Sequence, residues 1–360
     1  MKVLHICQNY NTKLYSDLFN ELESFEIKQT VFFPYIGDFK YHKNAKIKIV
    51  SKKSVRSLFR HFFMLRAIYN YLNLVKSINV NNFDVIHCHT LYNDGIVGVI
   101  ASFVYGKKLV ITMRQSDIHI HKNKIWLRVF LLLYSKSKIS YISVSPYIKK
   151  YFSHIPSKVI GNGIKDAFFQ NAKEKFLRKG KIQLIYIGRI IKRKNLDVVL
   201  NLVTKYNEHY NLTIVGDRLS ESKWSNEVFL RINTLKNVEY HASLSPNKII
   251  DKLDESNIFI MPSINETFGI VYIEAMSRGL PIIYKKGTAV DGLFKKKVGL
   301  GLRSYNSNEI HSQINQILPD YEEISKNCML YSRIYNWNNV AETIINIYNE
   351  NHKNINNIIS

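Results

Sequence analysis

Acidic residues are scarce in the first part of this 360-residue sequence. The whole chain has 28 Asp and Glu against 51 Lys and Arg, and residues 1–160 alone have 8 acidic against 24 basic side chains. After Lys40 and before position 160, the only acidic residues are Asp84, Asp94 and Asp117. The overall charge of +23, carried mainly by one half, predicts an acidic partner: nucleic acid, anionic lipid or a phosphorylated substrate.

Cysteines and long apolar runs are few as well. Cys7, Cys88 and Cys328 are an odd number, and two lie in apolar, strand-like runs, which predicts buried, reduced thiols rather than a disulfide framework. The longest apolar stretches, 95–105 and 125–134, are shorter than the ~20 residues of a membrane span. The initial MKVLHICQNY lacks the apolar core of a signal peptide. We therefore expect a cytoplasmic protein that is soluble or peripheral on a membrane.

The common nucleotide-binding signatures are also missing. The sequence has no G-x-G-x-x-G, no Walker A motif and no internal repeat. What it does have is the composition of a globular protein, 46% hydrophobic and 22% charged, in a chain long enough for two domains of roughly 150 to 180 residues. Short apolar runs typical of buried parallel strands alternate with helical patterns, which indicates an α/β fold.

The most informative stretch spans residues 257–283. An apolar run at 258–261 is typical of a buried parallel strand, and Pro262 ends it. Apolar residues then recur at helical spacing over 268–278, before Gly279 and a further buried strand. This strand–loop–helix–strand unit places its loop at the carboxyl end of a parallel sheet, where such sheets bind ligands.

The loop and the start of that helix carry groups suited to a phosphorylated ligand. Glu266 and Glu274 are eight residues apart, roughly 12 Å along a helix, so their carboxylates can reach the two ends of an extended ligand. An isolated Glu pair of this kind is more often a solvated surface pair. The backbone N–H groups that we expect to be unpaired at the positive end of the helix are those of Thr267, Phe268, Gly269 and Ile270.

The surrounding frame resembles the donor-site signature of the retaining glycosyltransferases of family 4. It consists of the strand, Pro262-Ser263, Glu266, Phe268-Gly269, Glu274-Ala275-Met276, Gly279 and Pro281. The resemblance implies the GT-B fold, in which two Rossmann-like, doubly wound parallel-sheet α/β domains face each other across a cleft. It also implies an acceptor-binding domain at 1–160, a nucleotide-sugar domain at 161–335, a helix at 336–350 that crosses back to the first domain, and a frayed tail at 351–360.

A basic loop follows the expected first strand of the second domain, residues 182–187. Gly188, Arg189 and Lys194 in this loop match a glycine and two cations of the family pattern. The resemblance implies that Arg189 and Lys194 neutralise the departing diphosphate, that Glu274 accepts hydrogen bonds from ribose hydroxyls, and that Glu266 does so from the transferred sugar. It implies no cofactor and no metal, because the nucleotide-sugar is a substrate.

Two neighbouring strand ends carry the candidates in the first domain. Residues 83–90 end in His87 and His89, and residues 109–113 are followed by Arg114, Asp117, His119 and His121. The paired histidines invite a zinc hypothesis, but no Cys or carboxylate joins them at ligand-like spacing, so we expect no metal. We expect His89 to be a packed residue with one hydrogen bond.

In the family these strand ends border the acceptor and the transferred sugar. Arg114 stands where the family pattern has a histidine, so we expect it to bind an acidic sugar or an acceptor phosphate. Asp117 keeps the acidic position. The candidate catalytic residues are thus Glu266, Asp117 and Arg114, and the candidate acceptor-side residues are His89 and Asn162.

Two other segments depart from the family pattern. Residues 10–15 lack the usual glycines of the first loop, and Ala289 replaces a usual glycine in the loop 285–292, which resembles one that touches the donor. Gly161 and Gly163 resemble the turn into the second domain, where they would act as a hinge.

The function implied is transfer of a hexose or N-acetylhexosamine from a UDP- or GDP-linked donor, by a retaining, metal-independent mechanism. The basic first domain suggests a membrane-linked acceptor of bacterial surface polysaccharide synthesis (O-antigen, capsule or lipopolysaccharide) at the inner face of the cytoplasmic membrane. The helical pattern at 56–76 fits either an interfacial helix on anionic lipid or a core-facing helix with a basic solvent face.

Two other functions remain open. A sugar-nucleotide epimerase of the same fold would share the donor site but would need no acceptor. A basic nucleic-acid-binding protein would account for the charge, although its aromatic residues should then lie in an exposed groove. The aromatic residues here fall mainly on apolar faces, so we expect no nucleic-acid partner.

Overall fold

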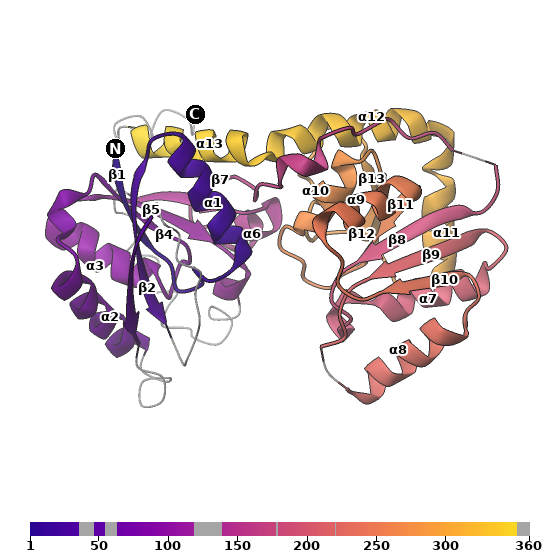
Figure 1. Cartoon of the computed structure of the whole chain (residues 1–360), viewed down its shortest axis with the longest axis horizontal. Helices are drawn as coiled ribbons and strands as arrows, with labels where there is room; N and C mark the ends of the chain where they lie inside the picture. The colour runs from indigo at the N-terminus through magenta and orange to yellow at the C-terminus, as the bar shows by residue number, and fades with distance from the viewer. Residues whose placement is uncertain (36–46, 55–62, 119–138, 178, 220, 351–360) are drawn as a thin grey trace. The chain divides into compact units, whose positions relative to one another are not determined.

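The computed structural model describes residues 1–35, 47–54, 63–118, 139–177, 179–219 and 221–350. They form two compact units, each with its own parallel sheet (Figure 1). The first unit contains Met1–Val144, Ile148–Asn162 and Trp337–Ser360, and the second contains Ser145–Tyr147 and Gly163–Asn336. The chain therefore passes from one unit to the other between Asn162 and Gly163, two residues after the boundary expected from the sequence.

Some sequence predictions fall outside the described residues. These are the start of the helix at 56–76, the whole of the apolar segment 125–134, His119 and His121, and the tail at 351–360. Among the described residues, no helix is both long enough and apolar enough to cross a membrane.

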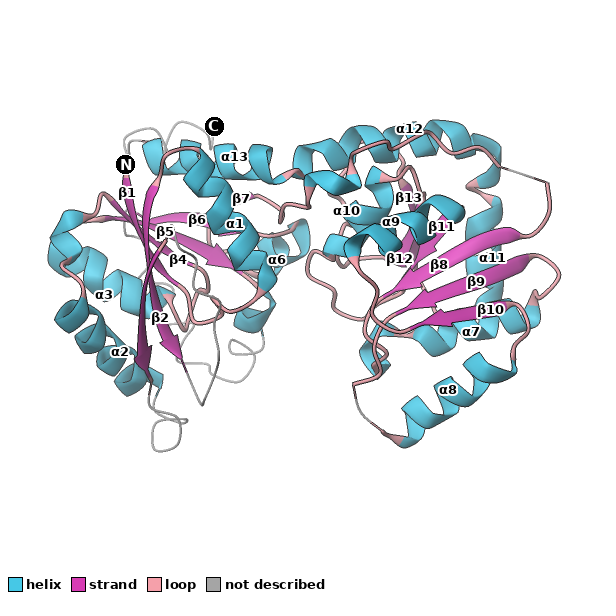
Figure 2. Ribbon diagram, in the orientation of Figure 1, coloured by secondary structure: helices cyan, strands magenta, loops and turns pink. Residues whose placement is uncertain are grey.

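The first unit has a seven-stranded parallel sheet in the order β3-β2-β1-β4-β5-β6-β7. Helices flank the sheet (Figure 2), so the inner strands β1, β4 and β5 are mostly buried, whereas the edge strands β3 and β7 are partly exposed. The strands are β1 (Lys2–Ile6), β2 (Lys28–Tyr35), β3 (Lys48–Lys53), β4 (Val85–Cys88), β5 (Lys108–Met113), β6 (Ile139–Ser143) and β7 (Ser157–Val159). The helices are α1 (Lys13–Ser24), α2 (Phe63–Ser77), α3 (Gly95–Tyr105), α6 (Pro146–Tyr151) and α13 (Trp337–Asn349), with a 3-10 turn η1 (Val80–Asn82).

Helix α13 belongs to the core of the first unit although it comes after the whole second unit. Trp337, Ile344 and Tyr348 are buried in one cluster with residues of β1, β2 and α1. The ammonium of Lys108 donates to the carbonyls of Ile347 (2.5 Å) and Tyr348 (3.0 Å), where it meets the negative end of the helix dipole.

The second unit has a six-stranded parallel sheet in the order β10-β9-β8-β11-β12-β13. The strands are β8 (Ile182–Ile187), β9 (Tyr210–Val215), β10 (Val238–His241), β11 (Ile258–Ile260), β12 (Ile282–Lys285) and β13 (Gly299–Leu302). The helices are α7 (Leu196–Lys205), α8 (Lys223–Thr234), α9 (Pro246–Glu255), α10 (Ile270–Ser277), α11 (Ser307–Asn315) and α12 (Tyr321–Ser332). The 3-10 turns are η2 (Asp166–Phe168), η3 (Lys192–Lys194), η4 (Leu318–Asp320) and η5 (Arg333–Tyr335).

Both sheets have the strand order of a doubly wound fold. The first strand of each unit, β1 or β8, lies between the strand that follows it in the chain and a later one, β4 or β11. Strand order reverses at this point, and the carboxyl ends of the strands there are where sheets of this kind bind ligands. The predicted pair of Rossmann-like units is confirmed.

Helix α10 begins later than the sequence pattern predicts. Its first residue is Ile270 rather than Phe268, because Gly269 takes a left-handed conformation (φ 70°, ψ 74°) and forms the N-cap. Phe268 therefore lies before the helix, where its ring is buried 5.3 Å from the ring of Tyr335. Hydrophobic periodicity alone could not separate this buried residue from the helix that follows it.

Candidate functional site

An ion pair between Lys194 and Glu266 lies at the carboxyl ends of β8 and β11. Lys194 ends the turn η3 and Glu266 precedes α10, so the fold joins side chains that are 72 residues apart in the sequence. The hydroxyl of Ser263 also donates to the Glu266 carboxylate (3.4 Å). Because both side chains are almost closed off from water, their attraction is stronger than that of a surface pair, and it fixes both groups in place.

Hydrogen bonds hold the two loops of this pair together. The Ile264 N–H donates to the Arg193 carbonyl (2.7 Å), and the side-chain amide of Asn195 donates to the Pro262 carbonyl (2.8 Å). Asn195 adopts a left-handed conformation (φ 53°), which Asn tolerates better than most residues. The basic turn is thus fixed against the loop that carries Glu266.

The other predicted residues of the basic turn lie beside this pair. Gly188 packs closely, because a Cβ there would be 3.3 Å from the sulfur of Met261. The side chain of Arg189 is exposed at the same edge of the sheet. Arg193, which the sequence reasoning did not single out, has a buried Nη1 with no hydrogen-bond partner among the described residues. The run Lys192-Arg193-Lys194 was visible in the sequence, but which of its cations turn inward depends on the fold.

The start of α10 presents backbone donors near Glu266. Four consecutive N–H groups have no acceptor in the part of the chain that the structure describes, those of Phe268, Gly269, Ile270 and Val271. The N–H of Thr267, which we expected to be unpaired, instead donates to the Glu266 carboxylate (3.3 Å). The hydroxyl of Tyr272 donates to the Met261 carbonyl and anchors the helix to the end of β11.

Glu274 and Ala289 are the remaining residues of the second unit that the sequence singled out. Glu274 is half-buried on α10, while its neighbours Ile273 and Ala275 are fully buried. Ala289 is buried in a left-handed conformation (φ 49°), and its N–H donates to the Glu266 carbonyl (2.8 Å). The loop that resembles a donor-contacting loop of the family is therefore hydrogen-bonded to the backbone of Glu266.

A second group of predicted residues lies at the carboxyl ends of β4 and β5 in the first unit. The Arg114 guanidinium donates from Nη1 to the Asn162 side-chain oxygen (2.9 Å) and lies 5.1 Å above the Tyr15 ring. Asp117 is fully buried and accepts from the backbone N–H groups of Arg114 (2.8 Å) and Tyr92 (3.4 Å). Its carboxylate therefore holds the loop after β4 to the loop after β5.

Burial raises the pKa of the Asp117 carboxyl to about 6, against the opposing effect of its backbone donors. A second buried carboxyl, Asp94, was not among the predicted site residues. It accepts from the Gln8 N–H (3.1 Å) and the Thr90 hydroxyl (3.0 Å), and burial raises its pKa to about 7. Asp94 thus supports the glycine-free loop after β1, a contact that spans 86 residues and leaves no signal in the sequence.

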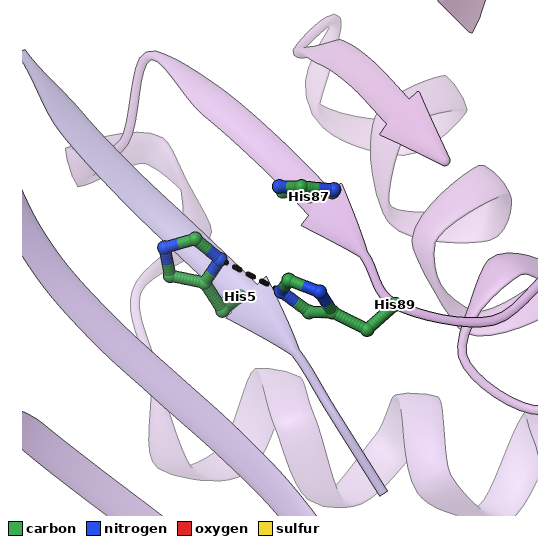
Figure 3. Close-up of side chains that lie close together, drawn as sticks. All are labelled: His5, His87 and His89. Atoms are coloured by element: carbon green, nitrogen blue, oxygen red, sulfur yellow. Dashed lines mark hydrogen bonds between the residues drawn. The ribbon is translucent and has the colours of Figure 1, made fainter. Parts of the chain in front are cut away.

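His89 lies in a buried cluster with His5 and His87 (Figure 3). Nδ1 of His5 and Nε2 of His89 share a hydrogen bond of 3.0 Å, as expected for a packed His89. His87 contacts the Tyr348 hydroxyl (2.6 Å) and the Thr112 hydroxyl (2.9 Å) through its two ring nitrogens. Burial lowers the pKa of His5 to about 3 and holds those of His87 and His89 well below the usual value.

This cluster shows what the sequence reasoning missed. Each histidine offers one ring nitrogen, and the three atoms lie within 4.8 Å of one another, so they are candidate metal ligands. Both nitrogens of His87 are already within hydrogen-bonding distance of hydroxyl groups. His5 escaped notice because it lies on β1, and only the pairing of β1 with β4 places its Cα opposite that of His87.

A cavity of about 660 Å³ lies elsewhere in the second unit. Its lining includes Gln183, Asn257 and Arg278, and the first two lie at the amino ends of β8 and β11. Arg278 is buried there against Asp254 (2.6 Å) and nearby carbonyl groups. The cavity contains none of the predicted site residues.

Two family models match the chain one after the other. The model described as Glycosyltransferase Family 4 matches residues 15–168, and the model described as Glycosyl transferases group 1 matches residues 168–333. Together they span residues 15–333, and each predicted site residue lies within one of the two matches.

Individual relatives agree with this assignment. The chain is 23% identical to an uncharacterized glycosyltransferase of Methanocaldococcus jannaschii, over 89% of this chain and 97% of the relative. It is 25% identical to the UDP-Gal:alpha-D-GlcNAc-diphosphoundecaprenol alpha-1,3-galactosyltransferase of Escherichia coli, over 81% and 80%. Among solved structures, Anabaena HepE in complex with UDP has the same fold, with a TM-score of 0.75 and 18% identity over 96% of this chain and 99% of HepE.

Proposed function

Since this chain belongs to the family 4 glycosyltransferases, of glycosyl transferases group 1, we propose that it transfers a hexose or N-acetylhexosamine from a UDP- or GDP-linked donor. The reaction proposed is retaining and independent of a metal. The proposed acceptor is a membrane-linked saccharide in bacterial surface polysaccharide synthesis. Glycosyltransferase activity follows from the family, while the donor, the acceptor and the stereochemistry are the proposal.

The observation that carries the proposal is the Lys194–Glu266 pair beside the unpaired N–H groups of α10. A nucleoside diphosphate that leaves the sugar develops negative charge, which an ammonium and aligned backbone donors stabilise without further rearrangement. Arg189 supplies a second, exposed cation at the same edge. These groups provide the charge that a metal ion supplies in other enzymes, so we propose that none is needed.

In this proposal the carboxylates of Glu266 and Glu274 bind the transferred sugar and the ribose of the donor, respectively. Glu266 is oriented by Lys194 and Ser263, so that it can accept hydrogen bonds from hydroxyls of the transferred sugar. Glu274 lies further along α10 and would accept from the ribose hydroxyls. UDP bound to the structurally similar HepE supports a uridine nucleotide as the donor, and the name of the Escherichia coli relative supports a lipid-linked acceptor.

Helix α2 supports binding of the first unit to a membrane surface. Leu65, Ile68, Tyr69 and Leu72 follow each other at helical spacing, and all four are exposed. Phe103, on the neighbouring helix α3, is 90% exposed. A row of exposed apolar side chains along a helix of a strongly basic unit suits the boundary of an anionic bilayer.

Release of nucleotide from a panel of UDP- and GDP-sugars tests the transferase. We expect one donor to release nucleotide only when a membrane extract supplies acceptor, and EDTA to have no effect. Lys194→Met should lower kcat about 100-fold or more. Lys236→Met, at an exposed position before β10, is the matched control. The anomeric configuration of the product tests retention.

Other outcomes of that assay would contradict the proposal. An altered nucleotide-sugar without nucleotide release would establish an epimerase instead. For the membrane part, a Leu65→Ser/Leu72→Ser variant should lose affinity for phosphatidylglycerol vesicles at low salt. Leu230→Ser, which changes an exposed leucine of the second unit, should not. Equal binding by both variants would exclude α2 as the contact.

A further inference from the structure

Arg114 is fixed in place before any ligand arrives. It directly follows β5, at the carboxyl end of the first sheet. Its backbone N–H donates to Asp117 (2.8 Å), its Nη1 donates to Asn162 (2.9 Å), and its guanidinium lies over the Tyr15 ring at 5.1 Å. One edge and one face of the guanidinium are thus held, and the edge formed by Nε and Nη2 remains.

That remaining edge has no hydrogen-bond partner and no ion pair in the described part of the first unit. Nε is buried and has no hydrogen-bond partner there, and no carboxylate forms an ion pair with the guanidinium. Asp117 attracts the guanidinium electrostatically, but neither of the two nearby carboxylates makes an ion pair with it. Asp117 accepts backbone N–H groups, and Asp94 accepts from Gln8 and Thr90.

The adjoining segment supplies no acidic side chain. Residues 119–138, which follow directly, contain no Asp or Glu and add five Lys and Arg. Asp117 attracts the half-buried guanidinium without an ion pair to it, which leaves part of its desolvation cost uncompensated. Arg114 therefore occupies a position that becomes favourable when an anion is bound.

We propose that Arg114 binds an oxoanion carried by a substrate of the transfer reaction, either a carboxylate on the sugar of the donor or a phosphate on the acceptor. This inference rests on the proposed transferase function. A planar guanidinium matches both groups through two parallel N–H bonds, which a lysine ammonium cannot reproduce. Arg114 then determines specificity: it selects a charged substrate over the neutral analogue of the same shape.

Substitution of Arg114 with Gln or Lys tests the proposal in the full-length enzyme. The donor arm compares UDP-glucuronate with UDP-glucose, and the acceptor arm compares a membrane extract with the same extract after phosphatase treatment. We expect wild type to prefer the anionic member of one arm. In that arm Arg114→Gln should raise KM for the anionic substrate about 10- to 100-fold and leave the neutral one unchanged. For the anionic substrate, the KM of Arg114→Lys should lie between those of wild type and Arg114→Gln.

A second variant keeps the test informative if Arg114→Gln does not fold. Asn162→Asp retains Arg114 but places a carboxylate against its Nη1. This internal anion should compete with the substrate, raising KM for the anionic substrate while the melting temperature stays at or above that of wild type. The arm in which KM rises identifies the source of the oxoanion.

Binding of UDP, measured by calorimetry, distinguishes loss of the oxoanion contact from loss of the donor site. If wild type and Arg114→Gln bind UDP equally and only anionic substrates are affected, the proposal stands. If wild type prefers the neutral member of both arms, or if Arg114→Gln affects neutral and anionic substrates alike, Arg114 has only a structural role. Absence of transfer from every donor would instead overturn the proposed function.

Discussion

Lys194 and Glu266 stabilise one another only as a pair. Their side chains are 12% and 11% exposed, so removal of one leaves the other charge largely buried and unpaired. We predict that Lys194→Met and Glu266→Gln each lower the free energy of unfolding by about 2 kcal/mol, less than for a fully buried pair because some solvent reaches both groups. The double variant should lose less than the sum of the two, which urea denaturation in a double-mutant cycle measures.

A surface pair provides the comparison. Lys252 contacts Glu239, whose side chain is 52% exposed, and Glu255 on its own helix. Lys252→Met should cost less than about 1 kcal/mol. Strict additivity at Lys194 and Glu266, or equal costs at the two sites, would show that the inner pair adds nothing beyond a solvated contact.

The backbone conformation of Ala289 could not be predicted from the sequence. The sequence identified the position as one where related loops carry glycine, but it could not say whether the backbone there is twisted. The structure gives φ 49° and a hydrogen bond to the Glu266 carbonyl. A left-handed conformation costs a residue with a Cβ about 1–2 kcal/mol, so a strained position supports Glu266 directly.

Helix α10 depends at its start on Gly269. A Cβ at this position would lie 2.5 Å from the Tyr272 ring and 3.1 Å from Cγ of Glu266, in addition to the cost of the left-handed φ. We predict that Gly269→Ala lowers the free energy of unfolding by more than 2 kcal/mol and reduces nucleotide binding, because the first turn of α10 and Glu266 must both shift. Thermal denaturation and calorimetry with UDP measure the two effects.

Gly106 offers a matched control for that substitution. It forms the C-cap of α3 with a similar left-handed φ of 64°, but a Cβ there would have nothing within 4 Å. Gly106→Ala should therefore cost only about 1 kcal/mol and leave nucleotide binding unchanged. If both variants lost the same stability, the close contacts at Gly269 would be without consequence.

Elements were more predictable from the sequence than the contacts between them. Buried strands such as β8 and β11 can be recognised in the sequence as short apolar runs rich in β-branched residues, because parallel strands are apolar on both faces. The assembly of Lys194 with Glu266, or of Asp94 with Gln8, depends instead on which strands are neighbours. A single sequence does not record which strands are neighbours. The resemblance to family 4 placed Lys194 and Glu266 in one donor site, whereas nothing in the sequence linked Asp94 to Gln8.

The stability of the molecule should depend on pH through its buried histidines. The folded pKa of His5 is lowered by burial to about 3, against 6.5 in the unfolded chain. Between these values the unfolded state binds the extra proton, so stability falls as the pH drops from 6.5 toward 3. We predict that His5→Phe is less stable than wild type at pH 7.5. Its melting temperature should fall by less than that of wild type when the pH is lowered from 6.5 to 4.

Asp94 should act in the opposite direction. Burial raises its pKa to about 7 from an unfolded value of 3.8, so the folded state holds the extra proton between these values, and stability is lost as the pH rises toward 7. Asp94→Asn removes this penalty. The melting temperature of the variant minus that of wild type should therefore be larger at pH 8 than at pH 4.5. Parallel pH profiles for wild type and both variants would refute the two assignments.

The order of the chain has a consequence for how the protein is made. The second unit is almost continuous in sequence, whereas the first needs α13, which the ribosome completes only after the second unit. Until then the nascent first unit lacks Trp337 and Tyr348 from its core, and His87 lacks one of its two hydroxyl partners. We therefore expect the second unit, although translated later, to reach its native state first, and the first unit to complete its fold only after α13 has been synthesised.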